Sequence, residues 1–453
     1  MGQCGRYIVK AVPILLRVAA LGIITFLISC SDASLTPKEP VVLTLWQVYG
    51  GQTNSPMNET VEHFNQTVGR REGITVNVTS ISNSTDIHFA LVAAAENLPG
   101  AAEMPDMFIT YPKTALAINP ETLMDWNDVL DEKEREKFVP SFIEEGTIHD
   151  RLVLLPVAKS SSALFINATI FDQFSHETGV RYENLTTWEG MFDAAKRYYQ
   201  WSGGKAFFKY DDWLHYGMVN TASLGGTFFK NNTINFQDDV FKKIWHPLAI
   251  AGISGEVSLL GGYATTGMMT GEVLCGIEST SSVLYFKDKV TFPDNTTIPL
   301  RLKVLPVPCF EGGKPLAIQR GGGLGVTRST PKKEQAAAIF GKWLTAAENN
   351  VPLVITTGYM PVHKSAYKNF LEENKEVFPG ESHIEAYNAV LEIHKNYDFY
   401  IPPFFEEYGE VERRFSNGLL SLFKEHRQTG SAPSLLSEEL VQSMLDKLES
   451  IVK

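Results

Sequence analysis

Apolar and polar positions between residues 41 and 109 predict strands and helices in turn. Residues 41–46 are a largely apolar run that ends before a Gly-Gly pair, 74–78 alternate strictly, and 107–109 are a third apolar run. Each of these patterns predicts a β-strand. Between them, 57–67 have helical spacing and 87–96 are rich in alanine, so both predict helices. This order predicts an α/β fold with a parallel sheet and right-handed crossovers.

The alternation continues toward the C-terminus. Further strands are predicted at 152–156, 163–167, 273–277, 302–306 and 322–326, and further helices at 187–199, 241–251 and 333–344. From Ser382 onward the pattern is mostly helical, with a break at Pro402-Pro403. The segment 213–229 is aromatic and rich in glycine but has no clear period, so the pattern predicts no element there.

The N-terminus has the features of an export signal. Three basic residues precede an apolar run over 18–28, and no acidic residue occurs before Asp32. The run is too short to cross a bilayer, which takes about 20 residues, but it suits a signal peptide. The tetrad Leu-Ile-Ser-Cys at 27–30 resembles a bacterial lipobox, which implies that 1–29 are a lipoprotein signal peptide and that Cys30 is lipidated. An uncleaved N-terminal anchor is the alternative.

Lipidation would place the protein on a membrane. Two acyl chains on Cys30 anchor a protein stably, whereas one chain detaches readily. Residues 30–40 then form a short polar tether that contains two prolines. The expected location is the cell membrane, with the protein facing the periplasm or the exterior.

Loss of the signal makes the chain more acidic. The 453 residues carry a formal net charge of −12, and the signal removes three basic residues and no acidic one, which leaves −15. A surface this acidic argues against nucleic acid or an anionic lipid headgroup as a partner, because basic patches make those contacts. The mature length exceeds what one hydrophobic core usually supports, so two domains are expected.

The cysteine and glycine patterns predict neither a metal site nor a cofactor. If Cys4 leaves with the signal peptide and Cys30 is lipidated, Cys275 and Cys309 remain of the four cysteines. A disulfide between them stays open, since the sequence does not give their distance. There is no CxxC motif and the histidines are scattered, so no metal site is predicted. The glycine run at 321–325 lacks the GxGxxG spacing of a dinucleotide site.

Several short motifs then occur in a fixed order along the chain. They are Leu45-Trp46, Ala95-Glu96-Asn97-Leu98-Pro99, Met104-Pro105-Asp106-Met107-Phe108, Leu155-Pro156 with the serines that follow, Phe165-Ile166-Asn167 before Ile170-Phe171, Thr187-Trp188-Glu189, Gly322-Gly323, the 336–344 helix, and Thr357-Gly358-Tyr359-Met360-Pro361-Val362 before Lys364-Ser365-Ala366-Tyr367. Behind a lipobox, this order makes the chain resemble an extracellular solute-binding protein of an ABC importer, in the family of maltose- and glycerol-3-phosphate-binding proteins. The resemblance covers about residues 41–450, and its last motif looks closest to the glycerol-3-phosphate branch.

The resemblance implies a two-lobed, type II periplasmic-binding-protein-like fold with a ligand cleft between the lobes. The expected division is 41–155 plus 306–360 for lobe one and 156–305 plus 361–453 for lobe two, with crossovers near Pro156, Pro306 and Tyr359. The implied function is that of a lipid-anchored, monomeric binding protein. It would capture a carbohydrate or polyol phosphate and deliver it to ABC permease subunits, with no catalysis and no cofactor.

Candidate ligand-binding residues follow from this fold. Ser160, Ser161 and Ser162 follow a crossover strand, where hydroxyls can donate to and accept from sugar oxygens. Gly322 and Gly323 would let the backbone approach a ligand and offer N–H groups to an anion. The other candidates, aromatic faces and cleft hydroxyls, are Trp46, Tyr111, Trp213, Tyr216, Tyr359, Ser281 and Ser282. The alternatives are satisfied polar loops for the serines and core packing for the aromatic residues, except Tyr359, which its motif places at the cleft.

The charge of the ligand stays open. Arg413 and Arg414 correspond roughly to the place where the glycerol-3-phosphate branch has a phosphate-binding arginine. Both lie in a glutamate-rich helical run, so solvated i,i+4 ion pairs are the alternative. After Tyr111 the branch would have a glutamate, whereas this chain has Pro112.

Two other classes of function compete with this interpretation. An exported lipoprotein hydrolase of glycans or phosphodiesters would need paired carboxylates or an activated nucleophile. No Gly-x-Ser-x-Gly or HExxH motif occurs, although a carboxylate pair is not recognisable among 52 acidic residues. A lipid-anchored adhesin is the third class, and it would not need a closing cleft.

Overall fold

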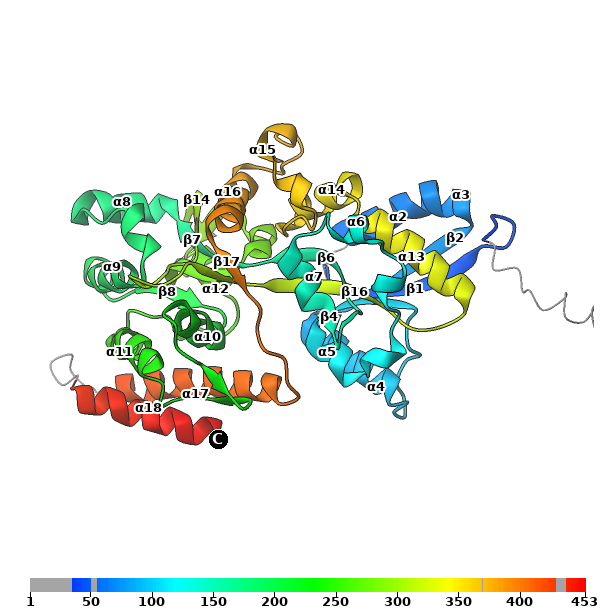
Figure 1. The fold of residues 1–453 in the computed structure, drawn as a ribbon. Helices are drawn as coiled ribbons and strands as arrows, with labels where there is room; N and C mark the ends of the chain where they lie inside the picture. Colours follow the sequence, from blue (N-terminus) through cyan, green and yellow to red (C-terminus); the bar gives the residue numbers. More distant parts are fainter. Residues whose placement is uncertain (1–34, 50–54, 369, 429–436) are drawn as a thin grey trace, which may run out of the picture.

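The computed structural model describes residues 35–49, 55–368, 370–428 and 437–453 (Figure 1). The predicted signal peptide, Cys30 and the start of the tether lie outside these residues. Two lobes are visible, each with its own sheet and core. The first is blue, cyan and yellow on the right of Figure 1, and the second is green, orange and red on the left.

The first lobe is built on a five-stranded sheet with the order β2-β1-β3-β16-β6. Its strands are β1 (Val41–Gln47), β2 (Ile74–Ser80), β3 (Met107–Thr110), β6 (Leu155–Ser160) and β16 (Arg320–Val326). As the sequence predicts, β1 pairs in parallel with both β2 and β3. β16 returns from later in the chain and lies antiparallel between β3 and β6.

Helices and short elements cover this sheet. They are α2 (Pro56–Phe64), the π-helix η1 (Asn65–Gly69), α3 (Arg70–Glu72), α4 (Ser84–Ala95), α5 (Pro112–Ala117), η2 (Pro120–Thr122), η3 (Trp126–Asp128), α6 (Glu132–Arg135), α7 (Pro140–Gly146), β4 (Thr147–Ile148), β5 (Arg151–Leu152), α13 (Pro331–Thr345) and α14 (Ala347–Thr357).

The second lobe is built on a mixed sheet with the order β14-β7-β11-β8. Its strands are β7 (Ser162–Asn167), β8 (Ala206–Tyr210), β11 (Val273–Ser279) and β14 (Leu302–Pro306). β11 pairs in parallel with β8 and antiparallel with β7, which also pairs antiparallel with β14.

The other elements of the second half of the molecule are mostly helical. They are α8 (Ala168–Thr178), η4 (Tyr182–Thr186), α9 (Trp188–Trp201), α10 (Trp213–Ser223), β9 (Phe229–Lys230), β10 (Thr233–Ile234), α11 (Asp239–Ser254), α12 (Ala264–Met269), η5 (Thr280–Tyr285), β12 (Lys289–Thr291), β13 (Thr297–Pro299), β15 (Leu316–Ile318), η6 (Lys364–Tyr367), α15 (Phe370–Glu373), α16 (Glu381–Asn396), β17 (Asp398–Tyr400), α17 (Tyr408–Gln428) and α18 (Glu438–Val452).

Helix α10 shows why the 213–229 segment has no readable period. Nearly every residue of α10 is buried, because the helix packs inside the second lobe rather than on its surface. A helix that is buried on all sides need not keep its polar residues on one face, so it loses the 3.6-residue alternation by which amphipathic helices are recognised. By contrast, α9 is amphipathic, and Thr187 caps its N-terminus, since Thr187 Oγ1 accepts a hydrogen bond from the Gly190 N–H at 3.2 Å.

Two connections between the sheets can be followed along the chain. Only Ser161 separates β6 of the first sheet from β7 of the second, and the return from β14 to β16 takes residues 307–319. The predicted lobe boundaries at 155/156 and 305/306 fall at the first residue of β6 and near the end of β14. The exact division into lobes stays a prediction.

A buried ion pair lies where β6 ends and β16 begins. Lys159 Nζ in β6 donates to Glu145 Oε2 at 2.5 Å and to the Gly321 carbonyl at 2.8 Å. Gln319 Nε2 also donates to Glu145 and, at 3.0 Å, to the Ser141 carbonyl. The Lys159 and Glu145 side chains are only 4% and 2% exposed, so α7, β6 and β16 are tied together by charges that water does not reach.

Both remaining cysteines are free thiols. Cys275 is buried in β11 opposite Ile166, and Cys309 Sγ is half-buried at 3.3 Å from Ser223 Oγ. The disulfide that the sequence left open is therefore not formed. Within the described ranges, no helix is both long enough and apolar enough to cross a bilayer.

Candidate functional site

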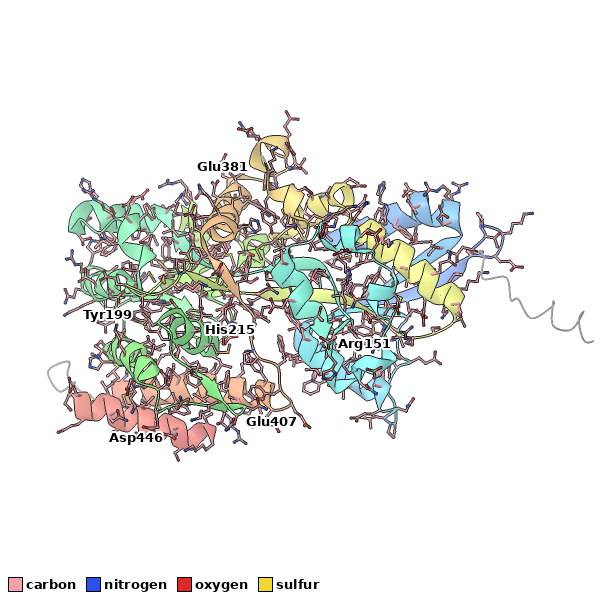
Figure 2. The ribbon with its side chains drawn as sticks, viewed as in Figure 1. Arg151, Tyr199, His215, Glu381, Glu407 and Asp446 are labelled. Carbon is pink, nitrogen blue, oxygen red and sulfur yellow. The ribbon has the colours of Figure 1, made fainter. Side chains whose placement is uncertain are left out.

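The carboxyl end of β8 carries polar side chains on the side of the second lobe that faces the first. Tyr210 ends the strand, and Asp212 is the N-cap of α10. Its Oδ1 accepts hydrogen bonds from the N–H groups of Leu214 at 3.1 Å and His215 at 3.3 Å. Figure 2 shows His215 in the second lobe, on the side toward the first lobe. Capping therefore fixes the Asp212 carboxylate at the end of a strand, where ligands bind in α/β sheets.

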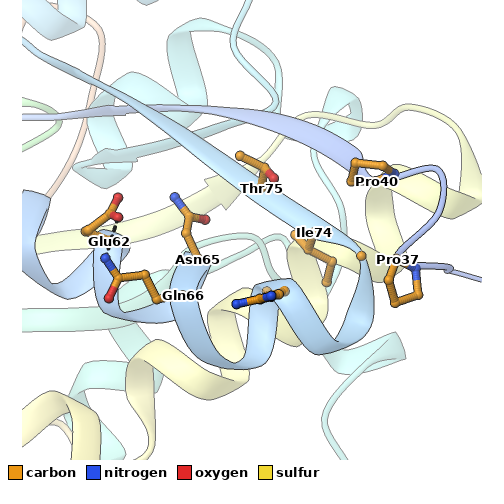
Figure 3. Close-up of a pocket in the computed structure, with 10 residues that line it drawn as sticks. Pro37, Pro40, Glu62, Asn65, Gln66, Ile74 and Thr75 are labelled. Carbon is orange, nitrogen blue, oxygen red and sulfur yellow. Dashed lines mark hydrogen bonds between the residues drawn. The ribbon is translucent and has the colours of Figure 1, made fainter.

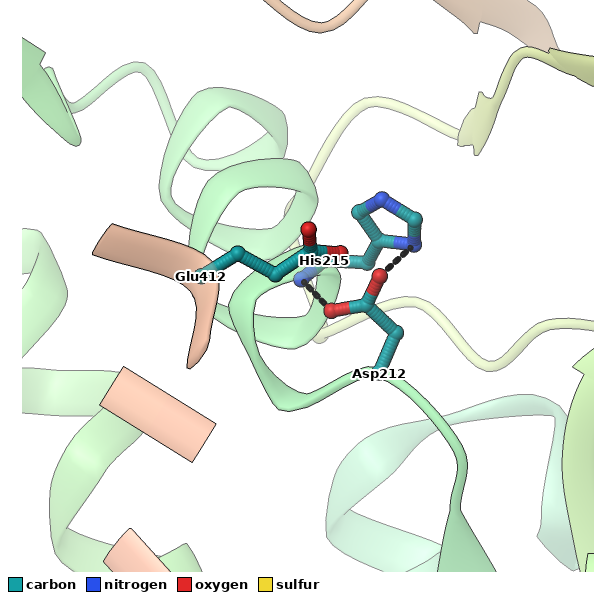
Figure 4. Close-up of side chains that lie close together, drawn as sticks. All are labelled: Asp212, His215 and Glu412. Carbon is teal, nitrogen blue, oxygen red and sulfur yellow. Dashed lines mark hydrogen bonds and ion pairs between the residues drawn. The ribbon is translucent and has the colours of Figure 1, made fainter. Parts of the chain in front are cut away.

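Helix α17 brings a second carboxyl group to Asp212. The oxygen and nitrogen atoms of Asp212, His215 and Glu412 that could bind an ion lie within 4.8 Å of one another (Figure 4). Nδ1 of His215 is 3.0 Å from Oδ2 of Asp212. The sequence singled out none of these three residues as a ligand-binding residue. Asp212 and His215 share α10, but Glu412 comes from α17, far later in the chain.

Burial and mutual repulsion set the charges of this group. Burial, followed by the negative charge of Asp212, raises the pKa of Glu412 to about 8. Burial lowers the pKa of His215 to about 4, although Asp212 opposes this. Burial also opposes ionisation of Asp212, but His215, Arg320 and Glu412 outweigh it and lower its pKa. At neutral pH, Asp212 is therefore ionised, Glu412 holds a proton and His215 is neutral.

Arg320 enters the same region from the first residue of β16, opposite Ser160 in β6. Burial lowers its pKa, but Tyr111 and the aspartates raise it more, so the guanidinium stays charged. After Tyr111, the groups whose negative charge raises the pKa of Arg320 belong to the second lobe, and they are Asp212, Asp211 and Tyr210. Asp211 is already paired with Lys209 at 2.9 Å. The Arg320 guanidinium makes no ion pair or hydrogen bond with any other described residue, so its five N–H donors are not committed.

Several tyrosines lie near Arg320, and Tyr111, Tyr210 and Tyr359 interact electrostatically with its guanidinium. Tyr49 and Tyr359 meet edge to face, with ring centroids 5.0 Å apart. Tyr111 interacts electrostatically with Tyr49, with Tyr359 and with Arg320. Burial raises the pKa of each of these tyrosines, so their hydroxyls are neutral donors and acceptors.

We call this group the interlobe cluster. Its members come from both lobes, and they are Tyr49, Tyr111, Tyr210, Asp212, His215, Arg320, Tyr359 and Glu412. It combines one arginine, one ionised and one neutral carboxyl group and several phenols.

Four of the residues predicted from the sequence lie in or beside the interlobe cluster. Tyr111 and Tyr359 belong to it, and Ser160 pairs with Arg320 across the two strands. Ser281 lies beside Tyr359 and lowers the pKa of that phenol, while its hydroxyl also contacts Ser279 Oγ at 2.8 Å. The fold therefore brings together Tyr111, Ser160, Ser281 and Tyr359.

The other predicted serines are buried close by. Ser161 Oγ donates to the Ile318 carbonyl at 2.8 Å, so this hydroxyl ties the crossing segments together. Ser162 lies beside Tyr210, and Ser282 lies beside Glu278, whose pKa burial raises to about 8. Their roles in ligand binding stay predictions.

The predicted glycines have a packing role. A Cβ on Gly322 would lie 2.8 Å from Ile109 Cγ2, and one on Gly323 would lie 2.8 Å from Leu154 Cβ. The strand register also shifts between these two residues, where β16 pairs with β6. Glycine is needed here because neighbouring strands approach too closely for a side chain.

Three predicted aromatic residues lie in hydrophobic cores. Trp46 packs among the apolar residues beneath α4, and Trp213 and Tyr216 are buried in the core of the second lobe. The Tyr216 hydroxyl donates to the Ile244 carbonyl at 2.8 Å. Core packing was the alternative interpretation of these three residues, and they do lie in cores.

Arg413 and Arg414 both pair with Glu410 on the outer side of α17. The Arg413 side chain is 61% exposed and lies 2.7 Å from Glu410, and Arg414 is also 2.7 Å from Glu410. These are the solvated i,i+3 and i,i+4 pairs of the alternative interpretation. Their neighbour Glu412 points toward Asp212 instead (Figure 4).

Asp212, His215 and Glu412 are also the residues that could hold a metal ion, since they offer two carboxylates and an imidazole. The charges around them oppose a cation, however. The positive charge of Arg320 interacts with all three groups. The positive charge of Lys113 on α5 interacts with His215 and Glu412. The donor set therefore suits a ligand that needs both donors and acceptors better than it suits a metal.

A separate hollow lies on the first lobe, away from the interlobe cluster (Figure 3). It is a surface groove of about 630 Å³ between the Pro37–Pro40 segment, η1 and the start of β2. Glu62, Asn65 and Gln66 line one side, and Gln66 Nε2 is hydrogen-bonded to Glu62 Oε1 at 2.7 Å. It holds no cluster of charged groups from separate elements comparable to the interlobe cluster.

The family of the chain follows from its sequence. The model of the family described as bacterial extracellular solute-binding protein matches residues 59–379. The chain belongs to this family. It is therefore an exported binding protein and not an enzyme, which removes the hydrolase alternative. A comparison with curated proteins gives no significant match.

Solved structures of two-lobed solute-binding proteins share this fold. The cyclic α-maltosyl-1,6-maltose binding protein from Arthrobacter globiformis is 19% identical, with a TM-score of 0.67 over 91% of this chain and 99% of that one. Maltose-bound MalE3 from T. maritima is 18% identical, with a TM-score of 0.65 over 90% and 99%. UgpB from Mycobacterium tuberculosis, solved with glycerophosphocholine, is 16% identical, with a TM-score of 0.68 over 91% and 98%. The predicted two-lobed fold is thus confirmed.

The proton that Glu412 shares with Asp212 in a side-chain hydrogen bond predicts a pH dependence of stability. Native Glu412 keeps its proton up to about pH 8, whereas the unfolded chain loses it near the ordinary value of 4.5. The native state therefore binds more protons in this window, and its stability falls as the pH rises, by up to about 1.4 kcal/mol per pH unit. We expect Glu412→Gln to reduce this slope by up to about 1.4 kcal/mol per pH unit, measured by urea unfolding of both proteins between pH 5.5 and 8. Part of the slope should remain, because burial also raises the pKa of Glu278 to about 8 and that of Glu256 to about 7.

Glu410→Gln is the matched control on the same helix. Hydrogen bonds from Arg413 and Arg414 lower the pKa of Glu410 to about 2, so this group does not titrate between pH 5.5 and 8. The Glu410→Gln variant should keep the wild-type slope. Equal slopes for wild type and Glu412→Gln would contradict the assignment of the proton to Glu412.

Proposed function

We propose that this solute-binding protein is the receptor of an ABC importer and that it captures a carbohydrate or a polyol phosphate at the interlobe cluster. The ligand would be enclosed when the lobes close and would then be delivered to the permease subunits. The proteins of similar fold were solved with maltose and with glycerophosphocholine, among other ligands. Both kinds of ligand carry several oxygens on a small carbon skeleton.

The observation that carries this proposal is the uncommitted guanidinium of Arg320 between the two lobes. A ligand rich in hydroxyl groups needs donors and acceptors at short range. Arg320 supplies several donors, Asp212 supplies a fixed acceptor, and the phenols supply both. We therefore propose Arg320, rather than Arg413 or Arg414, as the polar anchor of the ligand, with Tyr111, Ser160, Ser281 and Tyr359 beside it.

A thermal-shift screen tests the proposed function. The panel would contain maltose, cyclic glucans, glycerol 3-phosphate and glycerophosphocholine, with amino acids as negative controls. At a ligand concentration of a hundred times Kd, the free energy of unfolding should rise by about 2.7 kcal/mol. Small-angle scattering of the same complex should show a smaller radius of gyration. A panel without any shift, or tight binding without compaction, would speak against a closing receptor of this class.

Membrane anchoring through Cys30 is the second part of the proposal, and it rests on the sequence. Cys30→Ala should block processing by the lipoprotein pathway and abolish labelling by fatty acid, because only the thiol can form the thioether to a diacylglyceryl group. Cys309→Ala is the matched control and should leave labelling intact. Lipid labelling that persists in Cys30→Ala would show that Cys30 is not the anchor.

A further inference from the structure

Both chain neighbours of Arg320 are bound to one buried ion pair. On one side, the Gln319 side-chain Nε2 donates a hydrogen bond to Glu145. On the other side, the Gly321 carbonyl accepts one from Lys159 Nζ at 2.8 Å, and the same nitrogen lies 2.5 Å from Glu145 Oε2. The ion pair of Glu145 and Lys159 therefore holds the chain immediately before and immediately after Arg320.

Helix α7 brings the carboxylate of this pair to the start of β16. Glu145 lies in the last turn of α7, and Gln319 Nε2 also donates to the carbonyl of Ser141, one turn earlier in the helix, at 3.0 Å. Figure 1 shows α7 beside β6 and β16, on the side of the first lobe toward the second. Glu145, Lys159 and Gln319 are all buried, so water does not compete for these contacts.

The main chain around Arg320 is fixed as well. The Gln319 N–H donates to the Tyr400 carbonyl in β17 at 2.8 Å. Gly321 has a φ of +91°, and an added Cβ there would overlap the Ala158 carbonyl of β6, so only glycine fits. Arg320 thus begins β16 between two residues whose positions are set by contacts with α7, β6 and β17.

The position of this ion pair says more than its contribution to stability. A buried ion pair adds little net free energy of folding relative to apolar side chains of similar volume, because both charges are removed from water. The Arg320 guanidinium makes no ion pair or hydrogen bond with another described residue, so its direction depends on the backbone that carries it. A donor that is already in place binds a ligand more tightly, because less order has to be created on binding.

We propose that Glu145, Lys159 and Gln319 are positioning residues for ligand binding, which fix the backbone of Arg320 so that its guanidinium is directed between the lobes in the ligand-free protein. This inference rests on the proposed function, in which Arg320 is the polar anchor, and it adds the residues that act through that anchor. A purely stabilising role of the ion pair is the competing interpretation.

Calorimetry with maltose and glycerophosphocholine as probes tests the inference. Glu145→Leu/Lys159→Met removes the ion pair without leaving a lone buried charge, and it should weaken the probe that the wild type binds about 10-fold. In an Arg320→Ala background, the same two substitutions should change the affinity less than about twofold, because no guanidinium is left to position. A stabilising role alone would not make the loss depend on Arg320.

Gln319→Met is a second variant that keeps the ion pair and removes the hydrogen bonds of the amide to α7. It should weaken binding about 3- to 5-fold, again only when Arg320 is present. Glu385→Leu/Lys303→Met is the matched control. It removes a partly buried pair, 2.9 Å apart, that ties α16 to β14, and it should leave the affinity within about twofold of the wild type.

NMR relaxation of the ligand-free protein gives a readout that needs no ligand. The backbone N–H of Arg320 should have an order parameter of about 0.85 in the wild type, as in a rigid segment, and this should fall toward about 0.6 in Glu145→Leu/Lys159→Met. An order parameter that stays at the wild-type value in this variant would overturn the positioning role.

The outcomes separate this inference from the proposed function. If the wild type binds neither probe, the proposed function fails for these ligands, and the order parameter of Arg320 still decides whether the ion pair fixes its backbone. If a probe binds and Glu145→Leu/Lys159→Met weakens it equally with and without Arg320, or not at all, the positioning role is overturned and the proposed function stands.

Discussion

Replacing Arg320 with alanine is expected to weaken ligand binding at least about 30-fold. Loss of a charge-assisted contact in an enclosed site costs on the order of 2–5 kcal/mol, and the lower value corresponds to about 30-fold. Arg320 is the arginine that lies between the lobes with its donors uncommitted to other described residues. Calorimetry with the compound that gives the largest thermal shift measures the effect.

Arg413→Ala is the matched control for this experiment. Arg413 is exposed and paired with Glu410 at 2.7 Å, and such surface pairs contribute about 0–1 kcal/mol, so binding should change less than about 5-fold. Arg320→Lys keeps the charge but loses the planar fork, and it should fall between alanine and wild type for a phosphate-bearing ligand. A large loss in Arg413→Ala, with Arg320→Ala unchanged, would move the anchor to α17.

Glu145→Leu is expected to destabilise the protein by about 3–5 kcal/mol. The change leaves the Lys159 ammonium buried without its carboxylate partner, and an uncompensated buried charge is costly. Lys159 Nζ lies 2.5 Å from Glu145 Oε2, with both side chains almost inaccessible to water. Urea unfolding at pH 7 measures the loss.

The double variant Glu145→Leu/Lys159→Met distinguishes a buried charge from lost packing. Removing both charges should recover much of the stability, because the pair itself contributes little net free energy relative to apolar side chains. Glu425→Gln, in the exposed pair with Lys447 at 2.8 Å, should stay within about 1 kcal/mol of the wild type. A double variant as unstable as Glu145→Leu would show that the packing of these two side chains, and not their charge, determines the loss of stability.

Local pattern was sufficient to predict most of the elements. The strands at 41–46, 74–78 and 107–109 appear as β1, β2 and β3 with the expected parallel pairing, because alternation and apolar runs report on which faces are buried. The pattern failed at α10, where the surrounding core buries nearly every side chain and removes the period.

The binding residues were harder to predict than the elements. Tyr359 was a candidate because its motif is local in sequence, and Tyr111 was one because an aromatic ring can face a sugar. Asp212 and Arg320 were missed, although each lies at an end of a strand: Asp212 follows β8, and Arg320 begins β16 just before the glycine run. The position of a polar residue at a strand end was the available signal, and it does not say which strand ends meet.

The sequence by itself determined the α/β class, the order of the elements and the resemblance to solute-binding proteins, because these depend on local periodicity and on short motifs. Only the tertiary structure decided which charged groups face one another. Glu412 and Asp212 are 200 residues apart, and neither pattern nor motif places α17 against α10. The pKa of a carboxyl group depends on its surroundings in space, through burial and nearby charge, so the shared proton and the uncommitted Arg320 became visible only once the chain was folded.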